Sequence, residues 1–196
     1  QLFENSQIPD ELNDSSSPKL FFHCNPVISQ NARHLDTIVP IINSFLEKHP
    51  EYQVIISADQ YMPEFAQPGG AGDIIRSQIH SDKTIVYQYD EPVSLCKVID
   101  CCDVVITTKL HVGIVGAHLG KSVISFSGHT LKISRLYRQL GIGDRSIPLD
   151  TLTVDAGTEL LEAKYKSPVK VPETIVNAAK SNFAHLANFL NKYNKL

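Results

Sequence analysis

The stretch DVVITTKLHVGIVGAHLGKSVISFSGHTLK, residues 103–132, decides the fold class. It holds two short apolar segments, DVVITT (103–108) and KSVISFS (121–127), separated by a segment of helical length. Strands that are apolar on both sides are typical of parallel sheets that helices cover on both faces. The order strand, helix, strand therefore predicts one unit of an α/β fold.

The same alternation extends along most of the chain. Further strands are predicted at KLFFHC (19–24), YQVIISA (52–58) and KTIVYQY (83–89). Helices are predicted at 31–49, 73–80, 91–102, 110–119 and 130–140. We expect one Rossmann-like, doubly wound parallel sheet of about five to six strands.

The two ends of the chain differ from this regular part. Residues 1–18 are polar and include three consecutive serines, which predicts a linker or tail. A single domain is expected over 19–196. Within it, 144–172 is expected to be irregular, and a long amphipathic helix is expected at 174–193.

Composition excludes several classes of function. The chain has 196 residues, with 18 Lys and Arg against 21 Asp and Glu, and so lacks the basic excess of a nucleic-acid binder. No apolar run approaches the roughly 18 residues of a membrane span. The four cysteines lack the paired spacing of a zinc site, and we expect reduced thiols, a cytoplasmic location and no metal or cofactor. They are Cys24, Cys96, Cys101 and Cys102.

Ligands of such sheets bind beyond the carboxyl ends of the strands. The first of these loops, HCNPVISQN (23–31), has no glycine, so the dinucleotide fingerprint is absent, and no P-loop or GxSxG elbow occurs. Two later loops carry basic residues where helices begin, and free amide groups at helix amino termini attract anions. The pattern predicts a site for a small carboxylate or phosphate, with histidine able to carry a proton. The candidates are Thr108, Lys109, Leu110, His111, Ser127, Gly128, His129 and Lys132, with His23 and Asn25 added from the first loop.

Residues 89–142 resemble the C-terminal part of the polysaccharide pyruvyl transferase family. Its members carry an Arg-Leu-His triplet that opens a helix, then a Gly-x-Pro strand and a turn with lysine. Here the triplet is Lys109-Leu110-His111, the strand begins at Gly120-Lys121-Ser122, and the lysine of the turn is Lys132. The resemblance covers about fifty residues in order and spacing.

The resemblance implies a transferase of polysaccharide biosynthesis in the cell envelope. Family members move the pyruvyl group of phosphoenolpyruvate to a pair of sugar hydroxyls as a ketal. The chain would be the C-terminal half of a two-domain enzyme of the GT-B type, without its N-terminal domain. By resemblance His111 is the catalytic acid or base, while Lys109 and Lys132 bind the anionic groups of the donor.

Two other functions stay open. A nucleotide-sugar glycosyltransferase of GT-B type usually holds the donor ribose with a carboxylate in its last βα segment, whereas residues 129–143 contain none. A non-catalytic module that binds a carbohydrate or a partner would share the fold without the chemistry.

Overall fold

The computed structural model describes residues 12, 16–24, 32–59, 64–128 and 130–193. Six parallel strands form one sheet in the order β3-β2-β1-β4-β5-β6. The strands are β1 (Lys19–His23), β2 (Gln53–Ser57), β3 (Thr84–Val86), β4 (Val104–Thr107), β5 (Ser122–Ser127) and β6 (Ser146–Pro148). The helices are α2 (Ala32–Lys48), α3 (Ala71–Gln78), α4 (Pro92–Asp100), α5 (Leu110–His118), α6 (Thr130–Gln139), α7 (Val154–Lys164) and α8 (Glu173–Tyr193), with a 3-10 turn η1 (Gly143–Arg145). The prediction of a doubly wound parallel sheet is confirmed.

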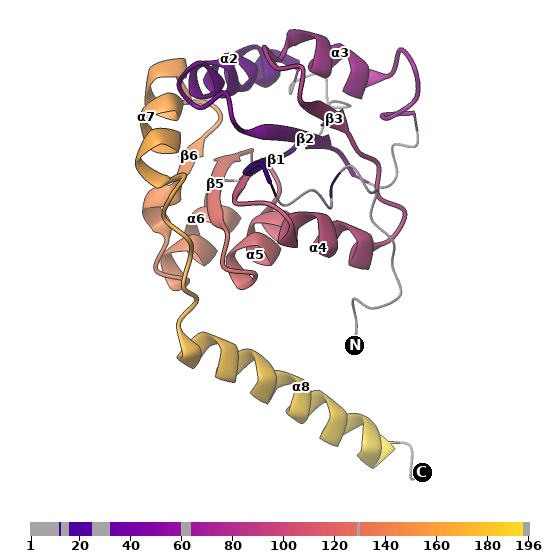
Figure 1. Ribbon diagram of the computed structural model, residues 1–196. Helices are drawn as coiled ribbons and strands as arrows, with labels where there is room; N and C mark the ends of the chain where they lie inside the picture. Colours follow the sequence, from indigo (N-terminus) through magenta and orange to yellow (C-terminus); the bar gives the residue numbers. More distant parts are fainter. Residues whose placement is uncertain (1–11, 13–15, 25–31, 60–63, 129, 194–196) are drawn as a thin grey trace.

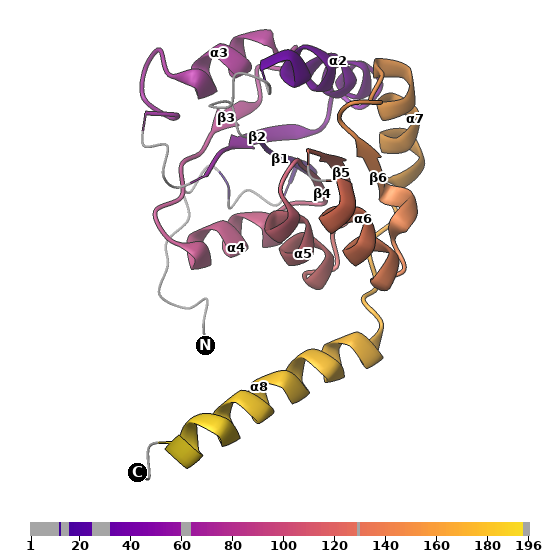
Figure 2. The same cartoon turned by 180° about the vertical axis from the view of Figure 1, so that it is seen from behind.

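Helices cover both faces of the sheet (Figures 1 and 2). Successive side chains of a strand point to opposite faces, so Phe22 joins the core under α2, α3 and α7, while Phe21 joins the core under α4, α5 and α6. The same alternation separates Ile106 from Val105 on β4. Since both sets are fully buried, the continuous apolar runs in the sequence are explained.

Strand register fixes which residues meet at the carboxyl edge of the sheet. His23, the last residue of β1, pairs with Ser57 on one side and with Thr107 on the other. Thr107 in turn pairs with Ser125 of β5. The loops that follow β1, β2 and β4 therefore leave the sheet next to one another.

Helix α5 packs tightly on the sheet because it carries glycines. A Cβ atom at Gly116 would lie 3.0 Å from Val123 Cγ2 and 3.2 Å from Val105 Cγ2. Gly120, which ends the turn after α5, has a φ of 69°, in the left-handed region that favours glycine. Gly116 thus allows the close approach of the helix to the sheet, and Gly120 allows the turn that follows it.

The expectation that 144–172 is irregular is wrong. This range contains η1, β6 and α7, and β6 extends the sheet beside β5. The signals were weak, because β6 has three residues and ends in Pro148, and because Gly157 lowers the helical propensity of α7. Gly157 is required by packing, since a Cβ atom there would lie 2.2 Å from Ile41 Cδ1. Buried Arg145 also donates to Ser167 Oγ at 2.8 Å and ties the segment after α7 to η1.

Helix α8 extends away from the body of the molecule (Figure 1). Its outer part exposes three large apolar side chains, Phe183, Leu186 and Phe189. Most of the expected linker at 1–18 lies outside the described residues, although Leu12 is buried in the core beside α4, α5 and α6. No helix in the described ranges is long and apolar enough to cross a membrane.

Gly113 tests how closely α5 and α6 pack. A Cβ atom there would lie 2.1 Å from the hydroxyl oxygen of Tyr137, a side chain with no exposed surface. We expect Gly113→Ala to lower the free energy of unfolding by about 1–3 kcal/mol, because the phenol has no room to move. Urea unfolding followed by circular dichroism measures the loss.

Tyr137→Phe provides the matched control. Its hydroxyl has no hydrogen-bond partner among the described residues, so the single change should cost less than about 1 kcal/mol. In the double variant the clash is relieved and most of the stability should return. Additive losses in the double-mutant cycle would contradict the proposed contact.

Candidate functional site

The site is built on the carboxyl ends of β1, β2 and β4. Helix α5 begins three residues after the end of β4, and its N-cap residue is Lys109, with an extended backbone (φ −108°, ψ 133°). The backbone N–H of Lys109 donates to Thr107 Oγ1 at 2.9 Å. This short turn leaves the Lys109 side chain beyond the strand ends and places His111 in the first turn of α5.

The candidates from the second basic loop lie beyond the neighbouring strand. Ser127 ends β5 and is buried, and its hydroxyl has no hydrogen-bond partner among the described residues. Gly128 and Lys132 are exposed, the latter in the first turn of α6. His111 is also exposed, whereas Thr108 and Leu110 are half-buried. His129 and Asn25 lie outside the described residues.

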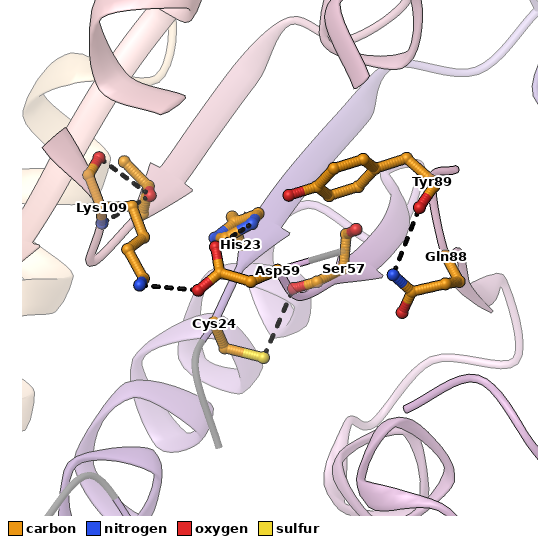
Figure 3. A network of polar contacts seen from close by, with 8 residues as sticks. His23, Cys24, Ser57, Asp59, Gln88, Tyr89 and Lys109 are labelled. Carbon is orange, nitrogen blue, oxygen red and sulfur yellow. Dashed lines mark hydrogen bonds and ion pairs between the residues drawn. The ribbon is translucent and has the colours of Figure 1, made fainter. Parts of the chain in front are cut away.

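Lys109 forms an ion pair with a residue that sequence reasoning missed. Its ammonium nitrogen lies 2.6 Å from Asp59 Oδ2 (Figure 3). Asp59 follows β2 after a single intervening residue, and its side chain is 17% exposed, against 36% for Lys109. The pair is therefore partly shielded from water, where charge attraction exceeds that of a fully exposed pair.

His23 lies beside this pair and is fully buried. Its Nε2 atom is 3.7 Å from Asp59 Oδ1, and neither ring nitrogen has a hydrogen-bond partner among the described residues. Burial lowers the pKa of His23 from 6.5 to about 4; Asp59 opposes this shift and Lys109 adds to it. At neutral pH the ring is therefore uncharged.

A neutral aromatic ring lies beside His23, whereas the thiol of the next residue, Cys24, lies in the core on the other face of the sheet. The Tyr89 ring lies 6.4 Å from the imidazole, centroid to centroid. The thiol of Cys24 donates to the carbonyl oxygen of Ser57 at 3.5 Å, and burial raises the pKa of this thiol. Cys24 is therefore a packed thiol rather than a nucleophile.

The arrangement suits an anion and a proton better than a metal ion. In the part of the chain that the structure describes, no three His, Cys, Asp or Glu side chains are grouped so that they could hold a metal. The edge combines a lysine, an acidic partner, a neutral imidazole and the amino termini of α5 and α6. Such termini attract negative charge.

The family assignment rests on a comparison with protein-family models. The model for polysaccharide pyruvyl transferase matches residues 6–130, which include Asp59 and the Lys109-Leu110-His111 triplet. The chain belongs to the polysaccharide pyruvyl transferase family. It therefore belongs to a family of transferases, and the resemblance seen in the sequence is confirmed. No curated protein matches the chain.

Solved structures show the same fold at low identity. A putative UDP-N-acetylglucosamine 2-epimerase from Listeria monocytogenes aligns with a TM-score of 0.61 and 10% identity, over 94% of this chain and 50% of the other. The UDP-GlcNAc 2-epimerase of Neisseria meningitidis aligns with a TM-score of 0.57 and 12% identity, over 88% of this chain and 44% of the other. The ADP-heptose LPS heptosyltransferase II of E. coli aligns with a TM-score of 0.52 and 12% identity, over 80% of this chain and 52% of the other. This chain spans about half the length of these GT-B glycosyltransferases and epimerases, which share its architecture.

The buried imidazole makes stability depend on pH. Because the folded-state pKa of His23 is about 4 and the ordinary value is 6.5, the unfolded chain binds more protons in that interval. The contribution of neutral, buried His23 to the free energy of unfolding is therefore complete above about pH 6.5, and it is lost as the pH falls towards about 4. We expect His23→Gln to remove this part of the loss, on the order of 1–3 kcal/mol.

Urea midpoints at pH 7.5 and pH 4.5 measure the effect in both proteins. Carboxylates that titrate in the same range affect both proteins alike, so the difference between the two slopes isolates His23. Parallel pH dependences would show that His23 keeps an ordinary pKa in the folded chain.

Proposed function

We propose that this chain binds phosphoenolpyruvate as the donor-binding half of a ketal-forming pyruvyl transferase. The observation that carries the proposal is the position of Lys109-Leu110-His111 at the amino terminus of α5, within the stretch that the family model matches. Phosphoenolpyruvate presents a carboxylate and a phosphate, and two neighbouring helix termini with Lys109 and Lys132 supply the charge to bind them. The acceptor is a saccharide with two hydroxyl groups.

The proposed reaction needs a proton at one carbon and an attack at the next. A sugar hydroxyl adds to C2 of the enolpyruvyl group as C3 gains a proton and becomes a methyl group. The second hydroxyl then displaces phosphate and closes the ketal. The two sugar hydroxyl groups lose two protons in total. One proton is balanced by the proton that C3 gains, and the other leaves with the phosphate.

In this proposal His111 is the acid or base that exchanges these protons. Its side chain is exposed in the first turn of α5, where it is open to a ligand above the strand ends. Thr108, Leu110, Ser127 and Gly128 surround the donor in this proposal, and a further domain supplies the acceptor side. The length of the aligned structures, about twice that of this chain, supports such a second half.

Ligand-dependent melting tests the donor class. We expect phosphoenolpyruvate at a hundred times its dissociation constant to stabilise the chain by about 3 kcal/mol, which raises the melting temperature by a few degrees. UDP-GlcNAc at the same concentration should leave it unchanged. The reverse result would favour the nucleotide-sugar glycosyltransferase, and no shift with either ligand in a folded chain would favour the non-catalytic module.

Variants of the triplet separate binding from chemistry. In the full-length protein, His111→Gln should lower acceptor-dependent phosphate release about 10²–10⁴-fold, because a positioned acid or base is lost. The melting shift with phosphoenolpyruvate should persist in this variant. Lys109→Met should abolish the shift, whereas Lys109→Arg, which keeps the charge, should retain it. Unchanged phosphate release in His111→Gln would remove this residue from the mechanism.

A further inference from the structure

The two oxygen atoms of the Asp59 carboxylate face different neighbours. Its Oδ2 atom contacts the ammonium of Lys109 at 2.6 Å, whereas its Oδ1 atom faces His23 Nε2 at 3.7 Å (Figure 3). The first distance is that of a strong charged hydrogen bond. The second exceeds the range of hydrogen bonds by about half an ångström.

His23 is the unsatisfied member of this group. A buried ring nitrogen without a partner costs on the order of 1–3 kcal/mol, and both nitrogens of His23 lack one among the described residues. Such groups are uncommon in folded proteins and need a reason. Here a small rotation of Asp59 would supply the missing acceptor to Nε2.

We propose that Asp59 is a positioning residue with two alternative partners: it holds Lys109 until an anionic ligand binds there, and it then turns to His23. The inference rests on the anion site of the proposed function, and it assigns to Asp59 and His23 a role in admitting the donor. Lys109 would contact the ligand directly, whereas Asp59 and His23 act through it.

Electrostatics explains why the exchange follows binding. A ligand anion on Lys109 cancels its positive charge and repels Asp59, so the pair loses most of its attraction. The carboxylate then faces His23, which is already within 3.7 Å. A proton taken from solvent makes His23 an imidazolium and completes a carboxylate–imidazolium hydrogen bond.

The groups around His23 favour this change. Charges act on the ring from Asp59, after β2, and from Lys109, after β4. Lys109 lowers the pKa of His23, so an anion that neutralises Lys109 removes one of the two causes of the low value. Among the described residues, the groups beside the ring on the same face of the sheet include the neutral side chains of Ser57 on β2, Thr107 on β4 and Tyr89 after β3.

The exchange also selects among ligands. A monoanion would replace one carboxylate on Lys109 with another of equal charge and would gain little. In a ligand with two or more negative charges, the second charge replaces no existing interaction, so its attraction to the positive amino termini of the helices is a full gain. Asp59 would therefore favour multiply charged donors over small monocarboxylates.

Calorimetric titration of the chain with sulfate tests the proposal, because sulfate carries two charges and takes up no proton itself at this pH. At pH 5.5, in buffers of different ionisation enthalpy, we expect wild-type protein to take up a substantial fraction of one proton per sulfate. His23→Gln should reduce this uptake. Asp59→Asn should also reduce it, and should bind sulfate about five-fold more tightly because the competing carboxylate is neutralised.

Asp100→Asn is the matched control. This variant also replaces a carboxylate by an amide in an ion pair, here with Lys121, whose Nζ atom lies 3.2 Å from Asp100 Oδ1. Lys121 precedes β5, so this pair lies at the opposite edge of the sheet from Lys109. Sulfate affinity and proton uptake should equal those of the wild type. If His23→Gln fails to fold, Asp59→Asn still tests the proposal. If Asp59 only held Lys109 in place, its loss would weaken sulfate binding, whereas the proposed competition predicts tighter binding.

The outcomes separate this inference from the proposed function. Equal proton uptake in wild type, His23→Gln and Asp59→Asn overturns the exchange, even if phosphoenolpyruvate stabilises the chain. Loss of uptake in both variants supports it, even if phosphoenolpyruvate proves not to be the donor. Failure of wild-type protein to bind sulfate overturns the anion site and this inference together.

Discussion

The parallel ladder between β1 and its two neighbours is the constraint on which the site depends. His23 is fixed opposite Ser57 and Thr107 by backbone hydrogen bonds, and both flanking strands end within this register. Asp59 and Lys109 follow these strands by two residues each, so they leave the sheet beside His23. A shift of either strand by one residue would turn its side chains to the other face and separate the three groups.

The position of Lys109 opposes an ordinary preference of helices. A helix amino terminus carries partial positive charge, and a lysine at the N-cap adds to it. Asp59 offsets this cost with an ion pair that is partly shielded from water. Local rules that a structure breaks at one point, with a compensating residue nearby, are typical of functional sites. The same pairing reduces the net positive charge that a ligand meets at Lys109.

Much of the fold could be predicted from the sequence, whereas the site could be predicted only in part. The apolar strands and the loops after β4 and β5 follow from local patterns, and Lys109 and His111 are visible there. Asp59 was missed because a single carboxylate after a strand resembles any solvated loop residue, and its partner is 50 positions further along the chain. The helix α7 was missed because its glycine, demanded by Ile41, hides the helical pattern. Such information belongs to tertiary packing and has no local signature.

The lysine at position 109, where other members of the family carry arginine, is consistent with a shared carboxylate. An arginine fork binds a carboxylate through two parallel hydrogen bonds and holds it in one plane. A lysine ammonium is a compact charge with three rotatable donors, and it binds one oxygen of Asp59 while the other oxygen faces His23. The point charge can also pass from one acceptor to another without breaking a bidentate geometry. In the proposed exchange, lysine in place of arginine would therefore change how an anion is admitted more than it changes the charge at this position.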